Sequence, residues 1–573
     1  MEPSGIQGGR PMKTLFKNGT VVNVFTGELL RENLLIGDGV VIGTGDYTDA
    51  DADTVRDVTG RFLCPGFIDG HIHIESTLLT PAELARTVLP HGTSAIVADP
   101  HELANVAGTD GIGFMLEMSE GLPLRVYIML PSCVPAMPLD ESGAVLGAAE
   151  LKPYYAHPRV PGLAEMMNYP GVLAGADYVT AKISDALAAG KVIDGHAPLL
   201  SGKALDRYIA AGIGSDHECS SAAEAIERVR KGQRVMIRQG TAARNLEALL
   251  PLFDEPYAHR CMLVSDDKHP EELLSDGHID AMIRTAVRAG KSAVTCIRMA
   301  TLQAAEWFGL RGVGALAPGF RADVNILRDL DSADVEAVYT SGKPAAENGV
   351  CFAFAAPDCR SPRWNRVMHS FRLDPLSEED LAVQPQQGKC RVIGVLPGQL
   401  LTEERLEALD FSQNNGIDTA RDILKLAVLE RHRGTGHRGI GYIQGIGLKR
   451  GAIAGSVSHD SHNLIVIGTN DADMAAAANR VRELEGGFVC AADGAVLAEL
   501  PLPVGGLMST EKARSVAAKN LLLNETVHKM GVPADIAPFM NMAFVSLTVI
   551  PRLKMTTRGL CDVSSQSTVP LFV

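Results

Sequence analysis

Residues 62–73 read Phe-Leu-Cys-Pro-Gly-Phe-Ile-Asp-Gly-His-Ile-His, an apolar run that ends in two histidines. On a β-strand, residues i and i+2 point to the same side. His71 and His73 can therefore bind one metal ion from one wall. The run predicts a buried strand that delivers two imidazoles to a site.

Seven further apolar runs follow, and each of them also ends in polar residues. The eight polar ends begin at or contain His71, Asp99, Ser132, Glu165, His196, His217, Arg238 and Asp266. Stretches that read as helices lie between them, for example residues 81–90, 222–231 and 246–253. Strands alternating with helices favour βαβ units and a parallel sheet. Eight such units in about 250 residues predict a (β/α)8 barrel, whose catalytic groups come from the carboxyl ends of the strands.

The rest of the chain predicts two further domains. Short β-like runs lie on both sides of the barrel segment, so residues 1–63 and 311–370 are expected to pair into one small β-sandwich-like domain around a barrel at 64–310. Polar residues 371–388 read as a linker. Residues 389–573 are predicted to form a C-terminal α/β or α+β domain. The expected class is α/β, with a distorted TIM-like barrel.

Composition excludes several classes of protein. The 573 residues are 46% hydrophobic and 21% charged, as in a globular protein, with a net charge of -15. That charge disfavours a nucleic-acid-binding surface. No apolar run approaches the roughly 20 residues that a membrane-spanning helix needs. The 10 cysteines lack CxxC spacing, so neither a zinc ribbon nor a disulfide framework is expected, and the protein is predicted to be cytoplasmic.

Four imidazoles and two carboxylates at the predicted strand ends form a candidate ligand set for two divalent ions. The six residues are His71, His73, Glu165, His196, His217 and Asp266. Mixed nitrogen and oxygen ligation suits zinc, manganese or iron(II). Any one of these residues alone could be structural, but six at equivalent positions favour a metal site. Asp266 and Asp267 compete for one position, and Asp266 is preferred because it is the first residue after the apolar run and Ser265.

The chain resembles the amidohydrolase superfamily in two segments, residues 65–73 and the return strand region 314–323. More narrowly, it resembles the bacterial two-domain adenine deaminases. The strings that carry this resemblance begin at His71, Asp99, Glu165, Asp194, Ser215, Ser265 and Ser458. The resemblance implies a distorted barrel that hydrolyses C–N bonds, with manganese or iron(II) as the metal. Glu165 stands where many relatives in the superfamily have a carboxylated lysine.

The resemblance implies hydrolytic deamination of adenine to hypoxanthine and ammonia by a hydroxide that attacks C6. His71, His73 and Asp266 would then hold one ion, and His196 and His217 the other. Glu165 would bridge the two ions. Asp266 is the expected proton carrier between the water and the leaving amine. The substrate is a small purine base, and a homo-oligomer (dimer or higher) is expected.

Other polar residues have less certain roles. Glu102, His101 and Asp99 follow the second strand and are candidates for the acid that protonates the ring. Asp99 or His101 could instead hold an additional metal or a hydrogen bond to a ligand, and the cluster could simply cap a helix. Residues predicted to contact the purine edge are Asn168, Arg238 and Gln239.

The histidine-rich residues 458–463 leave three alternatives open. They could reach over the barrel mouth, form a separate metal site, or shape an interface. Two functional alternatives also remain, namely another amidohydrolase acting on a cyclic amide or related C–N bond, and a barrel that has lost catalysis. A nucleic-acid deaminase is disfavoured because the P-C-x-x-C zinc signature of those enzymes is absent.

Overall fold

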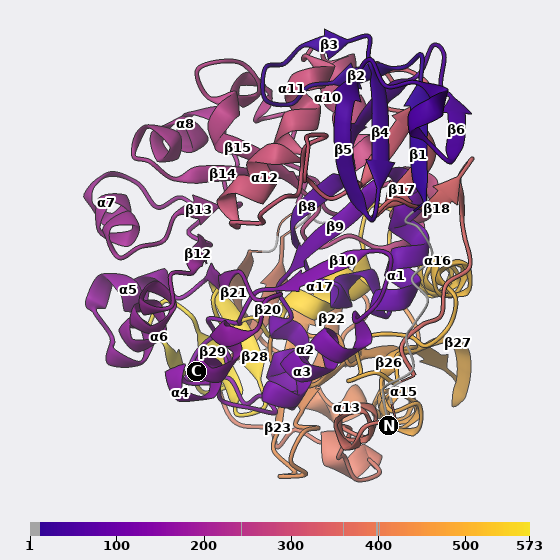
Figure 1. Ribbon diagram of the computed structural model, residues 1–573. Coiled ribbons are helices and arrows are strands. Elements are labelled where there is room, and N and C mark those ends of the chain that lie inside the picture. Colours follow the sequence, from indigo (N-terminus) through magenta and orange to yellow (C-terminus); the bar gives the residue numbers. More distant parts are fainter. Residues whose placement is uncertain (1–11, 242, 359, 397–398, 400) are drawn as a thin grey trace, which may run out of the picture.

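The computed structural model describes residues 12–241, 243–358, 360–396, 399 and 401–573. Parallel strands close into a barrel in chain order (Figure 1). Its strands are β8 (Phe67–Ile72), β9 (Thr93–Ala98), β10 (Arg125–Ile128), β11 (Gly162–Met166), β12 (Val192–Gly195), β13 (Ser215–Asp216), β14 (Arg234–Arg238) and β15 (Cys261–Val264). The ring is completed where the Asp266 amide donates to the His71 carbonyl oxygen at 2.9 Å.

Helices follow most barrel strands and cover the outside of the ring. They are α1 (Pro81–Val88), α2 (His101–Ala107), α3 (Thr109–Met118), α4 (Ala148–Leu151), α5 (Tyr169–Ala174), α6 (Asp177–Ala188), α7 (Gly202–Ala210), α8 (Ala222–Arg230), α9 (Pro270–Ser275), α10 (Ile279–Arg288), α11 (Ala293–Met299) and α12 (Leu302–Trp307). The helices expected at 81–90 and 222–231 are present as α1 and α8. The prediction of a helix at 246–253 is wrong, since only a 3-10 turn, Leu250–Phe253, forms there. Pro251 lacks the amide hydrogen that an α-helix would need at that point.

The first apolar run forms two strands instead of one. Phe62–Pro65 is β7, which belongs to a sheet of the small β domain in the order β19-β18-β17-β16-β7-β2-β3, and β8 begins the barrel after Gly66. A second sheet has the order β5-β4-β1-β6. The remaining strands of the two sheets are β1 (Lys13–Lys17), β2 (Thr20–Val22), β3 (Leu29–Leu30), β4 (Asn33–Gly37), β5 (Val40–Gly45), β6 (Thr54–Asp57), β16 (Val324–Leu327), β17 (Val335–Thr340), β18 (Lys343–Glu347) and β19 (Val350–Cys351).

The C-terminal domain is built on one large sheet, with strand order β21-β20-β23-β22-β25-β24-β26-β27, and a small sheet of β28, β29 and β30. The strands are β20 (Cys390–Val395), β21 (Thr402–Glu407), β22 (Ile423–Leu429), β23 (Arg438–Gln444), β24 (Ala452–Gly455), β25 (Leu464–Gly468), β26 (Gly487–Ala492), β27 (Ala495–Pro501), β28 (Leu553–Thr556), β29 (Gly559–Asp562) and β30 (Ser567–Thr568). The helices are α14 (Phe411–Asn414), α15 (Asp471–Glu483), α16 (Ala513–Lys529) and α17 (Pro538–Phe544). Helix α16 packs against α9, so this domain lies against the barrel.

Segments between the barrel and this domain are packed onto their neighbours. Helix α13 (Pro362–Met368) lies on α3, where the rings of Trp364 and Phe114 stack with centroids 5.3 Å apart. In the stretch expected as a linker, Phe371 and Leu376 pack on the core of the C-terminal domain. Among the described residues, no helix combines the length and apolar character needed to cross a bilayer.

Gly66 is the point where the chain passes from the small β domain into the barrel. Its amide donates to the Asp323 carbonyl oxygen at 3.0 Å, and a Cβ added there would lie 2.6 Å from the Cβ of Ser94. Both neighbours belong to strands or their ends, so they have little freedom to move away. The glycine therefore permits the close approach of the two domains.

We expect Gly66→Ala to destabilise the protein by about 1–3 kcal/mol, the usual effect of overpacking a core. The measurement is the urea dependence of unfolding, followed by circular dichroism. Ser94→Gly removes the clashing Cβ, so adding it to Gly66→Ala should restore part of the loss. A double variant no more stable than Gly66→Ala would contradict this explanation.

Candidate metal centre

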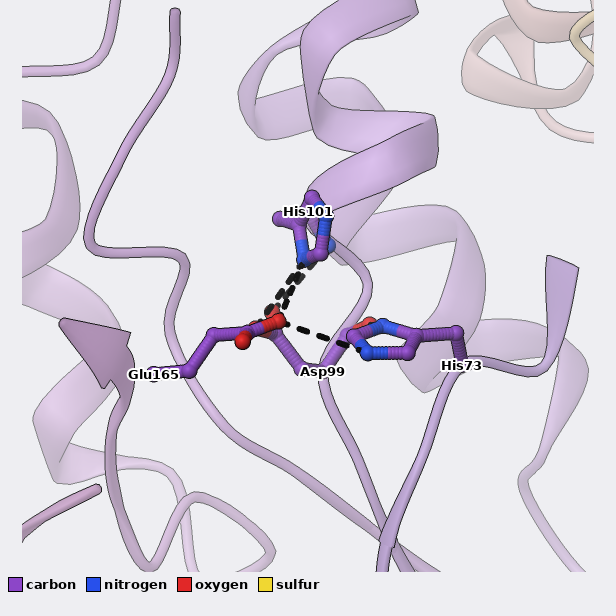
Figure 2. A group of neighbouring side chains, drawn as sticks. All are labelled: His73, Asp99, His101 and Glu165. Carbon is purple, nitrogen blue, oxygen red and sulfur yellow. Dashed lines mark hydrogen bonds and ion pairs between the residues drawn. The ribbon is translucent and has the colours of Figure 1, made fainter. Parts of the chain in front are cut away.

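Glu165 lies at the centre of the barrel mouth, at the end of β11, with its side chain buried. One carboxylate oxygen, Oε1, lies 3.3 Å from His73 Nε2 and 3.5 Å from His101 Nδ1 (Figure 2). The other, Oε2, lies 2.6 Å from His196 Nδ1 and 3.2 Å from His217 Nε2. The two oxygens therefore face two different pairs of imidazoles, which is the arrangement of a carboxylate that can bridge two ions.

A first ligand pocket lies between β8 and β15. Asp266 Oδ1 is 3.6 Å from His71 Nε2 and 3.3 Å from His73 Nε2. The Nδ1 atom of His73 is 3.1 Å from the Asp99 carbonyl oxygen, to which it donates, so its Nε2 keeps the lone pair that a ligand needs. His71 Nε2 is buried without a hydrogen-bond partner in the described part of the chain. Ligand atoms of His71, His73 and Asp266 all lie within 4.8 Å of one another, so these residues would be able to hold one divalent ion.

A second pocket lies at the ends of β12 and β13. It contains His196 Nδ1, His217 Nε2 and Glu165 Oε2, and Glu218 Oε1 lies 3.6 Å and 3.5 Å from the two histidine nitrogens. Sequence reasoning did not assign Glu218 a role. The sequence does contain a sign of such a role, since the carboxylate of Glu218 directly follows His217 at the point where the chain leaves the strand.

Arg238 connects the two pockets. Its guanidinium donates to both carboxylate oxygens of Glu218, with Nη2 3.0 Å from Oε2, and Nη1 lies 2.8 Å from Asp266 Oδ2. Arg238 was predicted to contact substrate, but here its donors are directed at two carboxylates. A planar guanidinium that pairs with two acids fixes their orientation, which a lysine could not do equally well.

The structure separates the two adjacent aspartates at the end of β15. Asp266 faces the histidines, and it has a positive φ of 58°, an uncommon conformation for a residue other than glycine. Asp267 accepts a hydrogen bond from Ser76 Oγ at 2.5 Å. Beneath them, Asp69 Oδ1 accepts from the amides of His71 and Ser265 at 3.2 Å and 3.0 Å. This carboxylate joins the ends of β8 and β15.

The other predicted substrate contacts lie elsewhere around the mouth. Asn168 caps α5 by accepting from the Gly171 amide at 2.9 Å, and it donates to the Tyr178 hydroxyl at 2.7 Å. It also lines a cavity of about 410 Å³. Gln239 lines a separate cavity of about 960 Å³ between the barrel and the small β domain.

The cluster after β9 adds donors on one side of Glu165. His101 Nδ1 lies 3.1 Å from Asp99 Oδ2, and its Nε2 lies 3.5 Å from Glu102 Oε1. In Figure 2, His73, Asp99 and His101 surround the carboxylate of Glu165. Ligand atoms of these four buried residues lie within 4.8 Å of one another. The group could thus hold an ion or orient Glu165 by hydrogen bonds.

Residues 458–463 reach the barrel through Glu102. His459 Nδ1 lies 2.5 Å from Glu102 Oε1, and His462 Nε2 bonds Glu102 Oε2. The Nδ1 atom of His462 accepts from the Ser458 amide at 3.1 Å, so the neutral ring carries its proton on Nε2 and donates it to Glu102. That tautomer has no lone pair at Nε2 for a metal. This geometry favours an interdomain contact over a separate metal site here.

Burial and charge pairing shift the pKa values of the buried carboxylates and histidines in opposite directions. Burial alone would raise the pKa of Glu102 and of Glu165, but the neighbouring imidazoles outweigh it and hold both pKa values well below the usual range. For His459, burial lowers the pKa but the Glu102 charge raises it to about 9. Burial lowers the pKa of His462 to about 4. At neutral pH, an ionised Glu102 thus lies between a charged His459 and a neutral His462.

The His459–Glu102 contact should make stability depend on pH. The pKa of His459 is raised from 6.5 to about 9 on folding, so its contribution is fully present below about pH 6.5 and is lost as the pH rises through 9. In His459→Asn, the amide keeps a donor near Nδ1 but carries no charge. We expect the wild type to exceed this variant in thermal midpoint at about pH 6. A difference between the two proteins that stays constant up to about pH 9.5 would contradict the charged pair.

Comparisons with known proteins identify relatives over nearly the whole chain. Residues 62–345 match the amidohydrolase family, and residues 399–567 match the adenine deaminase C-terminal domain. The chain is 46% identical to adenine deaminase 2 of Carboxydothermus hydrogenoformans, with 98% of each chain covered. It is 44% identical to adenine deaminase of Desulfatibacillum aliphaticivorans, with 99% of this chain and 98% of that one covered.

Solved structures that match part of the chain include dihydropyrimidinase from Brevibacillus agri. That enzyme is 17% identical, with a TM-score of 0.47 over 59% of this chain and 96% of that one. The relatives that match over nearly the whole length, together with the two matching family domains, establish that this chain belongs to the adenine deaminase family of the amidohydrolases.

Proposed function

We propose that this protein is a hydrolase that deaminates adenine, converting adenine and water to hypoxanthine and ammonia. The observation that carries the proposal is the position of Glu165, whose two oxygens face separate imidazole pairs. Relatives named adenine deaminase, 42–46% identical over nearly the full chain, support the choice of substrate. The chemistry at C6 needs a nucleophilic water and a proton carrier, and the barrel mouth contains groups suited to both.

The ligand assignment follows the two pockets. His71, His73 and Asp266 would hold one ion, His196 and His217 the other, and Glu165 would bridge them, with Glu218 near the second. Manganese or iron(II) suits this nitrogen and oxygen set, with zinc as an alternative. When bound, two such ions supply Lewis acidity that lowers the pKa of a shared water to near neutrality.

The protein residues then move protons. Asp266 has one oxygen among the ligands and the other held by Arg238 at 2.8 Å, so it is oriented to accept a proton from water. It can pass that proton to the departing amine. Protonation of the purine ring requires a second acid. We assign it to His101 in the cluster of Asp99, His101 and Glu102, because burial lowers the pKa of this imidazole but the charges of Asp99 and Glu102 outweigh burial and raise it, so that the ring carries a proton to give. The cluster contacts Glu165 on one side and the C-terminal domain on the other.

We also propose that the enzyme acts on the free base in the cytoplasm, as a homo-oligomer, with neither nucleic acid nor a membrane as partner. The net charge of -15 supports the absence of a nucleic-acid partner, because the acidic surface would repel a polyanion. All nine described cysteines are free thiols, as expected for a reducing compartment.

The purified protein should convert adenine to hypoxanthine once it is stripped and reloaded with manganese or iron(II). Absorbance and chromatography follow the reaction, and adenosine, guanine and dihydrouracil are assayed beside it. We expect turnover of adenine and none of dihydrouracil. Hydrolysis of dihydrouracil without deamination of adenine, in protein that binds two ions, would replace this proposal with cyclic amide hydrolysis.

Glu165→Gln should lower kcat by more than about 100-fold, beyond the usual effect of altering residues around metal ligands. The amide cannot offer two anionic oxygens to two ions, so the bound metal should fall below two ions per chain. Metal analysis and circular dichroism accompany the kinetics. A folded variant with full metal content and wild-type kcat would remove the bridging role.

A further inference from the structure

A cavity of about 470 Å³ lies at the end of the barrel opposite the candidate metal centre. The barrel contributes the turn 119–124 and Arg125, the first residue of β10, to its wall. The small β domain closes it with Thr340 at the end of β17 and Lys343 at the start of β18. Catalytic groups of such barrels come from the carboxyl ends of the strands, so this space is separate from the proposed chemistry. Its volume falls in the range of sites for small ligands.

Positive charge collects in this cavity, although the chain as a whole is acidic. The chain has 53 basic and 68 acidic residues. The cavity lining reverses that balance, with one acidic side chain, Glu120, and four basic ones, namely Arg125, Arg159, Arg321 and Lys343. A concave surface with such a local excess of cations attracts an anion.

The one carboxylate of the lining is already paired. Glu120 Oε2 accepts from Arg159 Nη2 at 2.7 Å, and the same guanidinium donates to the Ser119 hydroxyl at 2.7 Å and to the Leu116 carbonyl oxygen at 2.5 Å. Burial lowers the pKa of Arg159, and although Glu120 opposes this decrease, the positive charge of Arg125 adds to it. The two guanidiniums are therefore close enough to repel each other. A bound anion would relieve that repulsion.

Two cations of the lining remain available to a ligand. Arg125 and Lys343 are exposed, and neither forms an ion pair with a carboxylate in the described part of the chain. Arg125 lies beside the Tyr127 hydroxyl. Arg321 is held differently, since its Nε lies 2.6 Å from Asp323 Oδ2. A free guanidinium together with a free ammonium suits a phosphate group, which takes two hydrogen bonds from the first and pairs with the point charge of the second.

One side of the cavity is aromatic. Phe352 and Phe354 belong to the lining, and Phe352 is 43% exposed. The guanidinium of Arg86 lies over the ring of Phe354, 4.5 Å from its centroid. Within the described residues, no ring or guanidinium stacks on Phe352, so its face is open to a ligand. An open phenyl ring beside basic side chains is the combination that binds a nucleobase and its phosphate.

We propose that this cavity is a binding site for a nucleoside monophosphate, with the phosphate paired to Arg125 and Lys343 and the base stacked on Phe352. The two unpaired cations match the charge of about −2 that a phosphate monoester carries at neutral pH. The site goes beyond the deaminase function proposed above and does not depend on it. It gives the protein a second ligand site, at the end of the barrel away from the metal centre.

The first test removes the two free cations. Binding of adenosine monophosphate to the full-length protein is measured by equilibrium dialysis, and Arg125→Gln/Lys343→Gln should raise its Kd by at least about tenfold. The matched control is Lys203→Gln/Arg288→Gln, which removes the same charges at exposed residues outside this cavity. The control should change the Kd by less than about twofold, because distant exposed charges are screened. Equal effects of the two double variants would show a general response to net charge and would overturn the site.

The second test concerns the base. Phe352→Ala should raise the Kd of adenosine monophosphate by at least about fivefold through loss of stacking. Inorganic phosphate, measured as a competitor, should bind this variant as well as it binds the wild type. Phe25→Ala, at a phenylalanine that is 48% exposed and lies outside the cavity, is the control and should leave both values unchanged. Inorganic phosphate that binds the wild type as tightly as the nucleotide does would overturn a nucleotide as the ligand.

The third test locates the nucleotide relative to the barrel mouth. Saturating hypoxanthine should not displace adenosine monophosphate, because the cavity lies at the other end of the barrel. Displacement would place the nucleotide at the mouth and overturn the proposal. The dialysis measurements need no turnover, so failure of this proposal is distinct from failure of the deaminase function.

Discussion

The structure depends on the burial of one carboxylate among several imidazoles. Glu165 is almost fully buried, and an isolated ionised carboxylate in such a place is strongly unfavourable. It persists because each oxygen faces nitrogen donors from different strands. Those strands must close into a ring for the donors to converge, so the barrel and the site require one another. The negative charge that this site retains is also what would attract divalent cations.

The same logic recurs at the domain boundary. Glu102 is buried, and its two oxygens are bonded by His459 and His462, more than 350 residues later in the chain. Without the C-terminal domain, this carboxylate would face the barrel mouth with His101 as its neighbour. A buried charge that loses its partners is strongly destabilising, so the contact holds the two domains in one relative position.

The barrel and the candidate ligand positions could be predicted from the sequence, because barrel topology brings the carboxyl ends of all the strands to one edge. The candidate ligand positions were predicted from that rule, and Asp266 was preferred to Asp267 for its place directly after the apolar run and Ser265. The pattern could not show that Gly66 divides one run between two domains, since both halves are equally apolar. Glu218 was missed because adjacent strand residues normally point to opposite sides, and here the chain has already left the strand.

The partners of His459 could not have been found from spacing. Local patterns report which side of one element is buried, but a contact across 357 residues depends on how two domains dock. The sequence left residues 458–463 with three alternatives, and the tautomer of His462 argues against one of them, a separate metal site, since a nitrogen that donates to a carboxylate cannot also bind a metal. A hydrogen bond from one backbone amide, Ser458, thus favours an interface that also borders the site.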